Sequence, residues 1–137
     1  MFEALKNLEE IHIEAMKRLR NEGEAALREC FKAFFANHPN LYALKWCQYT
    51  PYFNDGEPCH FRVCEAEFCT EEGGEFYGSW GSAYNALSDE LRDDLRALTG
   101  YLQSDAIEPI LLAMFKDHSE ITVTATSITV DDYSSHD

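Results

Sequence analysis

Hydrophobic residues recur every three or four positions through the first 36 residues, and this spacing predicts amphipathic helix. The apolar stripe of its first half is Leu5, Leu8, Ile11, Ala15 and Leu19, with Glu, Lys and Arg between them. Gly23 follows this stripe, and glycine weakens a helix interior by about 1 kcal/mol relative to alanine. We therefore expect a kink or a break at Gly23, and a second helical stretch that ends before Pro39.

Polar and apolar residues alternate over residues 41–50 and again over 60–68, which predicts two strands. Asn54-Asp55-Gly56 lies between them and is typical of a turn, so residues 41–68 are expected to form a β-hairpin with a long loop. Residues 70–86 follow neither period and combine glycine, glutamate and aromatic residues. We interpret this segment as an acidic, glycine-rich and aromatic loop.

Leucines at three- and four-residue spacing return after Ser88, which has the side chain of a good helix N-cap. The pattern predicts helices over 88–116, with Pro109 in the first turn of the second. Residues 120–131 are expected to form a strand or a short hairpin that turns at Thr126 and Ser127, and 132–137 an acidic tail. The order of elements predicts one α+β domain over 1–137, with an antiparallel sheet of three or four strands packed against N-terminal and C-terminal helices.

Charge narrows the range of partners. The chain of 137 residues holds 25 Asp and Glu against 11 Lys and Arg, a formal net charge of −14. This excess opposes direct binding to nucleic acid or to an anionic membrane. Seven acids and one base fall in residues 70–94, and four acids and no base in 120–137. This distribution favours an acidic face, although acidic loops also serve solubility alone.

The cysteines bear on compartment and on catalysis. No signal peptide and no membrane-spanning run is recognisable, so we expect a cytoplasmic protein with reduced thiols. Cys59, His60, Cys64 and Cys69 are of the types that bind zinc, but their spacing differs from the paired C-x2–4-C of structural sites. The expectation is therefore no metal, no cofactor and no catalytic residue. A zinc- or thiol-dependent enzyme that uses these four residues is an alternative.

The run W-C-Q-Y-T-P-Y-F-N-D-G-E-P-C over residues 46–59 resembles a run in small acidic proteins of phage and bacterial genomes. Phe34, Phe35, His38 and Pro39 precede it as in those proteins, and a β segment with an aspartate-rich tail follows. No established activity is attached to that group. The resemblance implies a phage-encoded protein in the host cytoplasm, with a role in counter-defence (against CRISPR or restriction systems) or in host takeover.

Two classes of non-enzymatic function follow from these patterns. The first is an inhibitor that binds a basic, nucleic-acid-handling surface of a host protein, with its acids standing in for phosphates. The second is an adaptor or structural protein that forms a homodimer or larger oligomer through Leu5, Leu8, Ile11, Ala15 and Leu19. The residues proposed for the first function are Glu71, Glu72, Glu75, Tyr77, Trp80, Asp89, Glu90, Asp93 and Asp94.

Overall fold

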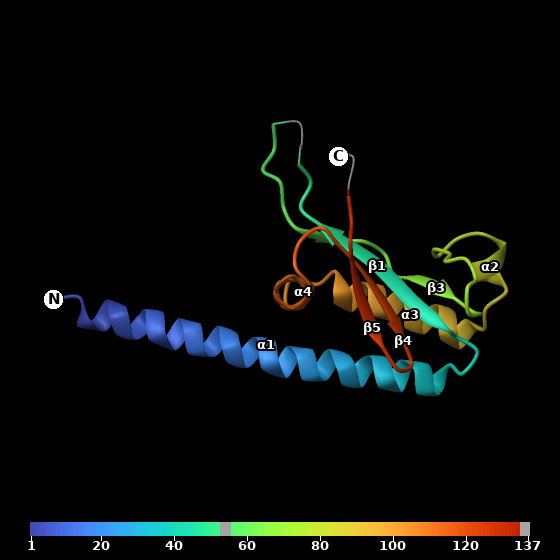
Figure 1. Ribbon diagram of the computed structural model, residues 1–137, viewed down its shortest axis with the longest axis horizontal. Coiled ribbons are helices and arrows are strands. Elements are labelled where there is room, and N and C mark those ends of the chain that lie inside the picture. The colour runs from blue at the N-terminus through green and yellow to red at the C-terminus, as the bar shows by residue number, and fades with distance from the viewer. Residues whose placement is uncertain (53–55, 135–137) are drawn as a thin grey trace.

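The protein combines four helices with one antiparallel sheet among the residues that the computed structural model describes, 1–52 and 56–134. The expected α+β class is thereby confirmed (Figure 1). The elements in chain order are α1 Glu3–Asn37, β1 Ala43–Tyr49, β2 Arg62–Val63, β3 Glu67–Cys69, α2 Ser82–Asn85, α3 Asp89–Leu102, α4 Glu108–Phe115, β4 Ser119–Thr124 and β5 Ile128–Asp132.

Strand β1 is the centre of the sheet. It pairs with β4 along one edge, from Ala43 opposite Thr124 to Gln48 opposite Ser119, and β5 continues the sheet beyond β4. Both β2 and β3 pair with its other edge. The sheet has five strands rather than three or four because the strand expected over 60–68 is interrupted between β2 and β3. In the interruption, the N–H of Ala66 donates to the Thr99 hydroxyl of α3, at 3.2 Å.

Alternate residues of β1 face the helices and form the centre of the core. Leu44 and Trp46 are almost completely buried. The ring of Trp46 packs against Phe31 of α1 and Phe115 of α4, with centroid distances of 5.8 and 6.1 Å. Helix α3 adds the leucines of its predicted stripe to the same core. Apolar residues therefore join both terminal helical regions to one face of the sheet.

Gln48 is a polar residue on the same face of β1, with no exposed surface. Its side-chain oxygen accepts from the indole N–H of Trp46, at 3.1 Å. Its amide donates to the carbonyls of Leu111 and Lys116, at 3.0 and 2.8 Å. The Lys116 carbonyl follows the C-terminal end of α4, where carbonyls lack partners within the helix. Gln48 therefore ties α4 to the central strand.

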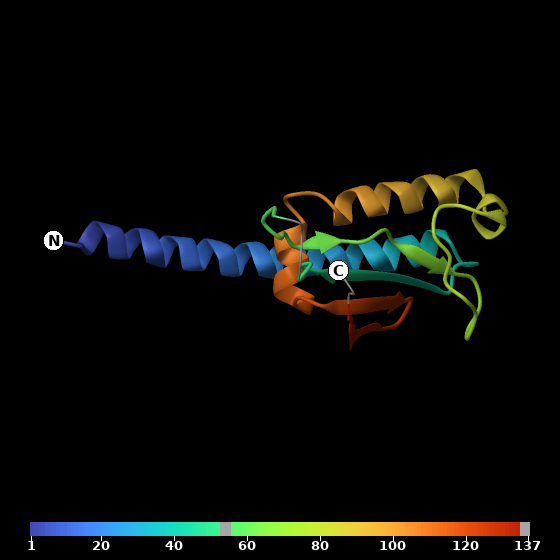
Figure 2. The ribbon, with the colours of Figure 1, turned by 90° about the horizontal axis from the view of Figure 1, so that it is seen from above.

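Helix α1 is continuous, so the expected kink or break at Gly23 is wrong. A Cβ at Gly23 would lie 2.7 Å from Cδ1 of Ile110, and only glycine lets α4 approach this closely. The N-terminal half of α1 extends well beyond the sheet and the other helices (Figures 1 and 2). The close packing of Gly23 on α4 thus holds the helix where its second half joins the core.

Several local predictions are matched by the described elements. The Ser88 hydroxyl accepts from the N–H of Leu91 at 3.2 Å and caps α3, and Pro109 lies in the first turn of α4. Strands β4 and β5 form the C-terminal hairpin. The loop expected over 70–86 contains α2 and a bridge from Tyr77 to Phe68 of β3. The predicted turn residues Asn54 and Asp55, and residues 135–137 of the predicted tail, lie outside the described residues.

Candidate protein-binding groove

A shallow groove of about 610 Å³ runs beside β3 and α2, where the segment after β3 folds back over the sheet. It brings together Glu65, from the segment between β2 and β3, and Glu67 of β3 with Glu75, Tyr77 and Trp80 of that segment after β3. The last three are among the residues proposed from the sequence. Glu65 and Glu67 were missed, because a strand acid is typically solvent-exposed and only the fold shows what lies beside it.

The groove exposes an aromatic ring that the loop holds in place. Trp80 retains 80 % of its surface in solvent, whereas large apolar side chains are usually buried. The N–H of Ser79 donates to Oε1 of Glu65, at 3.1 Å. A Cβ at Gly78 would lie 3.3 Å from the indole nitrogen of Trp80, and Gly81 adopts a φ of +93°. Glycines and one carboxylate therefore shape the loop around the exposed indole.

The charged side chains among the described residues that line the groove are glutamates. The Tyr77 hydroxyl donates to Oε2 of Glu75 at 3.3 Å. The pKa of Tyr77 is raised above its ordinary value, chiefly by the charge of Glu75 and also by that of Glu71, because both oppose ionisation of the phenol. Its described lining residues are acidic, apolar or uncharged. On the sheet nearby, Lys45 places its ammonium 4.2 Å from the ring centroid of Phe76.

The acids proposed on α3 have other contacts. Asp89 pairs with Arg92, and Asp93 pairs with Arg96 at 3.6 Å. Asp94 binds the buried ring of His38, with 2.7 Å between Oδ2 and Nε2, and lies in a cleft between α3 and α1. Neither these three nor Glu90, which is exposed on α3, line the groove.

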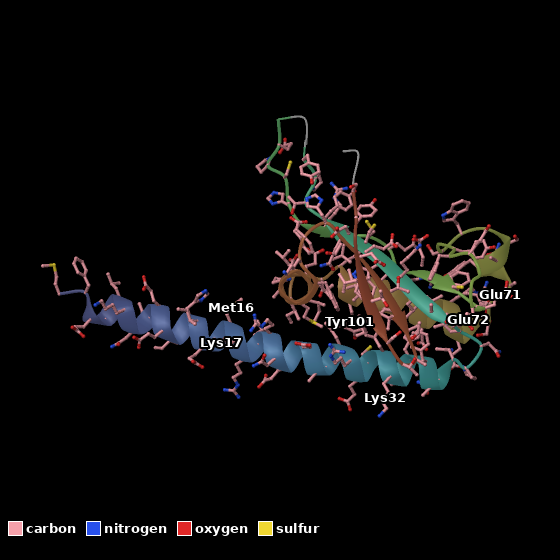
Figure 3. The ribbon with its side chains drawn as sticks, viewed as in Figure 1. Met16, Lys17, Lys32, Glu71, Glu72 and Tyr101 are labelled. Atoms are coloured by element: carbon pink, nitrogen blue, oxygen red, sulfur yellow. The ribbon has the colours of Figure 1, made fainter. Side chains whose placement is uncertain are left out.

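The two remaining loop acids lie at the groove's end of the molecule. Figure 3 shows Glu71 and Glu72 there, far from Met16 and Lys17 on the projecting part of α1. Both glutamates are exposed. No ion pair with a basic side chain involves Glu71, Glu72 or Glu75 in the described part of the chain. The loop acids, unlike Asp89, Asp93 and Asp94 of α3, are free to meet a cation from outside.

The cysteines pair in a way that the sequence did not indicate. No group of three His, Cys, Asp or Glu residues within 1–52 and 56–134 is placed to hold a metal ion, so Cys59, His60, Cys64 and Cys69 do not form the zinc cluster considered above. Cys64 instead lies opposite Cys47 of β1, and its N–H donates to the Cys47 carbonyl at 2.9 Å. The hydrogen bond between the two thiols lowers the pKa of Cys47 to about 7 and raises that of Cys64. The two cysteines meet because the register of β1 and β2 sets Gln48 opposite Val63, which brings the next pair, Cys47 and Cys64, together.

Comparison of the chain with protein-family models, curated proteins and solved structures gave no match. The resemblance of residues 46–59 to phage proteins therefore stays a prediction. No helix in the described part of the chain is both long and apolar enough to cross a membrane.

Proposed function

We propose that this protein is a non-enzymatic interaction protein whose groove binds a positively charged segment of a partner protein. The observation that carries the proposal is the exposed Trp80 in a groove that also holds Glu65, Glu67 and Glu75. Exposed aromatic rings and carboxylates together recognise lysine and arginine. The rings attract the cation through cation–π contacts, and the carboxylates form charge-assisted hydrogen bonds.

The charge of the whole chain supports the same kind of partner. A net charge of −14 attracts basic surfaces over long range and accelerates encounter with them. A partner that handles nucleic acid presents such a surface, and the acids of this protein would compete there with phosphates. A phage-encoded inhibitor of a host defence or replication protein is the setting that agrees with the resemblance of residues 46–59.

A fluorescently labelled arginine-rich peptide is a direct probe of the groove. We expect it to bind the full chain with an affinity that falls as salt rises, because screening weakens exposed charge pairs. Trp80→Ala should weaken binding about two- to fivefold, the effect of one exposed cation–π contact. Glu75→Gln should weaken it by a similar factor. Anisotropy titration of the labelled peptide measures all these affinities.

A matched control separates the groove from general charge. Asp131→Asn removes one negative charge from β5, as Glu75→Gln removes one from the loop, but Asp131 does not line the groove. We expect Asp131→Asn to bind the peptide as the wild type does. Equal weakening by both variants, or binding that is indifferent to Trp80→Ala, would mean that the peptide responds to net charge and that the groove is not the site.

A further inference from the structure

The projecting half of α1 exposes an apolar face that nothing in the described chain covers. Seven of its large apolar side chains are between 45 % and 64 % exposed: Phe2, Leu5, Leu8, Ile11, Ile13, Met16 and Leu19. Large apolar side chains exposed in this number on one half-helix mark an interaction site. We propose that the occupant of this face is the same half-helix of a second copy, packed antiparallel to it.

The exposed face continues the buried face of the same helix. Met16, Gly23 and Leu27 are separated by seven and four residues, so they lie along one side of α1. Gly23 and Leu27 pack on the body, whereas Met16, which is 45 % exposed, lies beyond the covered part of the helix. An apolar groove of about 380 Å³ opens there between α1 and α4, with Ile13, Met16, Pro109 and Ile110 in its walls. The exposed side of α1 and this groove can therefore accommodate another helix alongside α1.

The distribution of charge along the projecting half of α1 favours pairing with a second copy in the antiparallel direction. Residues 3–14 hold four acids and one base, and residues 17–20 hold three bases and no acid. An antiparallel pair places the acidic segment of each copy against the basic segment of the other, and two-fold symmetry satisfies both contacts at once. A parallel pair would instead place like charges together. The half-helix is therefore electrostatically complementary to itself in one direction only.

The apolar spacing fits the same antiparallel arrangement. Leu8, His12, Ala15 and Leu19 recur at intervals of four, three and four, which is the spacing of a coiled-coil seam. When Leu8 lies opposite Leu19 of the other copy, His12 lies opposite Ala15. Glu9 and Arg20 are eleven residues apart, close to three helical turns, so they share one flank of the seam. Glu9 of each copy then comes near Arg20 of the other.

The same register gives the groove its occupant. The α1 residues that line the groove run from His12 to Arg20. Positions that sum to 27 lie opposite each other, so residues 7–15 of the other copy lie beside this stretch. The middle of one projecting half-helix therefore lies beside the groove at the α4 helix of its mate.

Sedimentation velocity of the full chain over a concentration series tests self-association. We expect a monomer–dimer equilibrium for the wild type and a monomer for Leu8→Glu, whose side chain is exposed and outside the core. Tyr101→Glu is the matched control, because Tyr101 is 70 % exposed on α3 and has no part in the seam. It should dimerise as the wild type does. A wild type that stays monomeric overturns the proposal, as does a dimer that Leu8→Glu leaves intact.

A charge swap tests the direction. Glu9→Arg and Arg20→Glu should each weaken the dimer about tenfold, because attraction becomes repulsion at two symmetric exposed contacts. The double variant Glu9→Arg/Arg20→Glu should recover the affinity to within about threefold. Failure to recover overturns the antiparallel pairing. Binding of α1 to lipid vesicles without self-association would also overturn it. Trp80→Ala should dimerise normally, which keeps this test separate from that of the groove.

Discussion

Replacing Gly23 by alanine measures how closely α1 and α4 pack. The new Cβ would lie 2.7 Å from Cδ1 and 2.9 Å from Cγ2 of Ile110, well inside ordinary van der Waals contact. Helix propensity alone favours alanine by about 1 kcal/mol, whereas overpacking a tight site costs about 1–3 kcal/mol. We therefore expect Gly23→Ala to lower the free energy of unfolding by about 0–2 kcal/mol.

Gly100 provides the matched substitution. It lies in α3, and a Cβ there would meet no heavy atom within 4 Å, so only the propensity gain applies. Gly100→Ala should raise the free energy of unfolding by up to about 1 kcal/mol. Urea unfolding followed by far-UV circular dichroism, at one protein concentration for all variants, should separate the two alanine variants by about 1–3 kcal/mol.

The contact with Ile110 can be tested directly. Ile110→Val removes Cδ1, the atom nearest to the new Cβ, so it should cost less in the Gly23→Ala background than in the wild type. A double-mutant cycle measures this coupling. The reasoning would be refuted if Gly23→Ala stabilised the protein as much as Gly100→Ala does, or if the cycle showed no coupling.

Two further predictions concern side-chain pairs. Asp94→Ala leaves the buried His38 ring without its partner and should cost about 1–3 kcal/mol of stability in urea unfolding. Asp93→Ala breaks an exposed pair and should cost less than about 1 kcal/mol; equal losses would contradict the structural role of Asp94. Because the pKa of Cys47 is lowered to about 7, its thiolate fraction and its alkylation by iodoacetamide should rise with pH to half-maximum near pH 7. Peptide mass spectrometry should show this midpoint moving up in Cys64→Ala but staying in Cys64→Ser, which keeps a donor; an unchanged midpoint in Cys64→Ala would contradict the assignment.

The spacing of apolar residues was sufficient to predict an element where one face of that element is buried against the rest of the fold. The leucines of α3 and the alternation of β4 show their buried faces in the sequence itself. At Gly23 the local sequence was misleading, because glycine on its own destabilises a helix. What decides its conformation is Ile110, which is far along the chain and comes into contact only through the fold. Local propensity therefore gave the wrong expectation there.

Only part of the candidate groove could be predicted, because some of its residues come together only through the fold. Composition alone drew attention to Glu75, Tyr77 and Trp80, since an acidic loop rich in aromatic residues is unusual. It did not indicate Glu65 and Glu67, which line the groove from the segment between β2 and β3 and from β3 itself. The pairing of Asp94 with His38 was equally hidden, because it depends on how α3 packs against the end of α1.

The place of β1 between early and late partners has a consequence for synthesis of the chain. Its partners in β4 are 71 to 81 positions later, from Gln48 opposite Ser119 to Ala43 opposite Thr124. At translation rates of about 5–20 residues per second, β4 is synthesised roughly 4–16 s after β1. One edge of β1 has no strand partner until then. During that interval β2 and β3 can already protect the other edge. Completion of the core around Trp46 therefore follows the emergence of the last helix and hairpin from the ribosome.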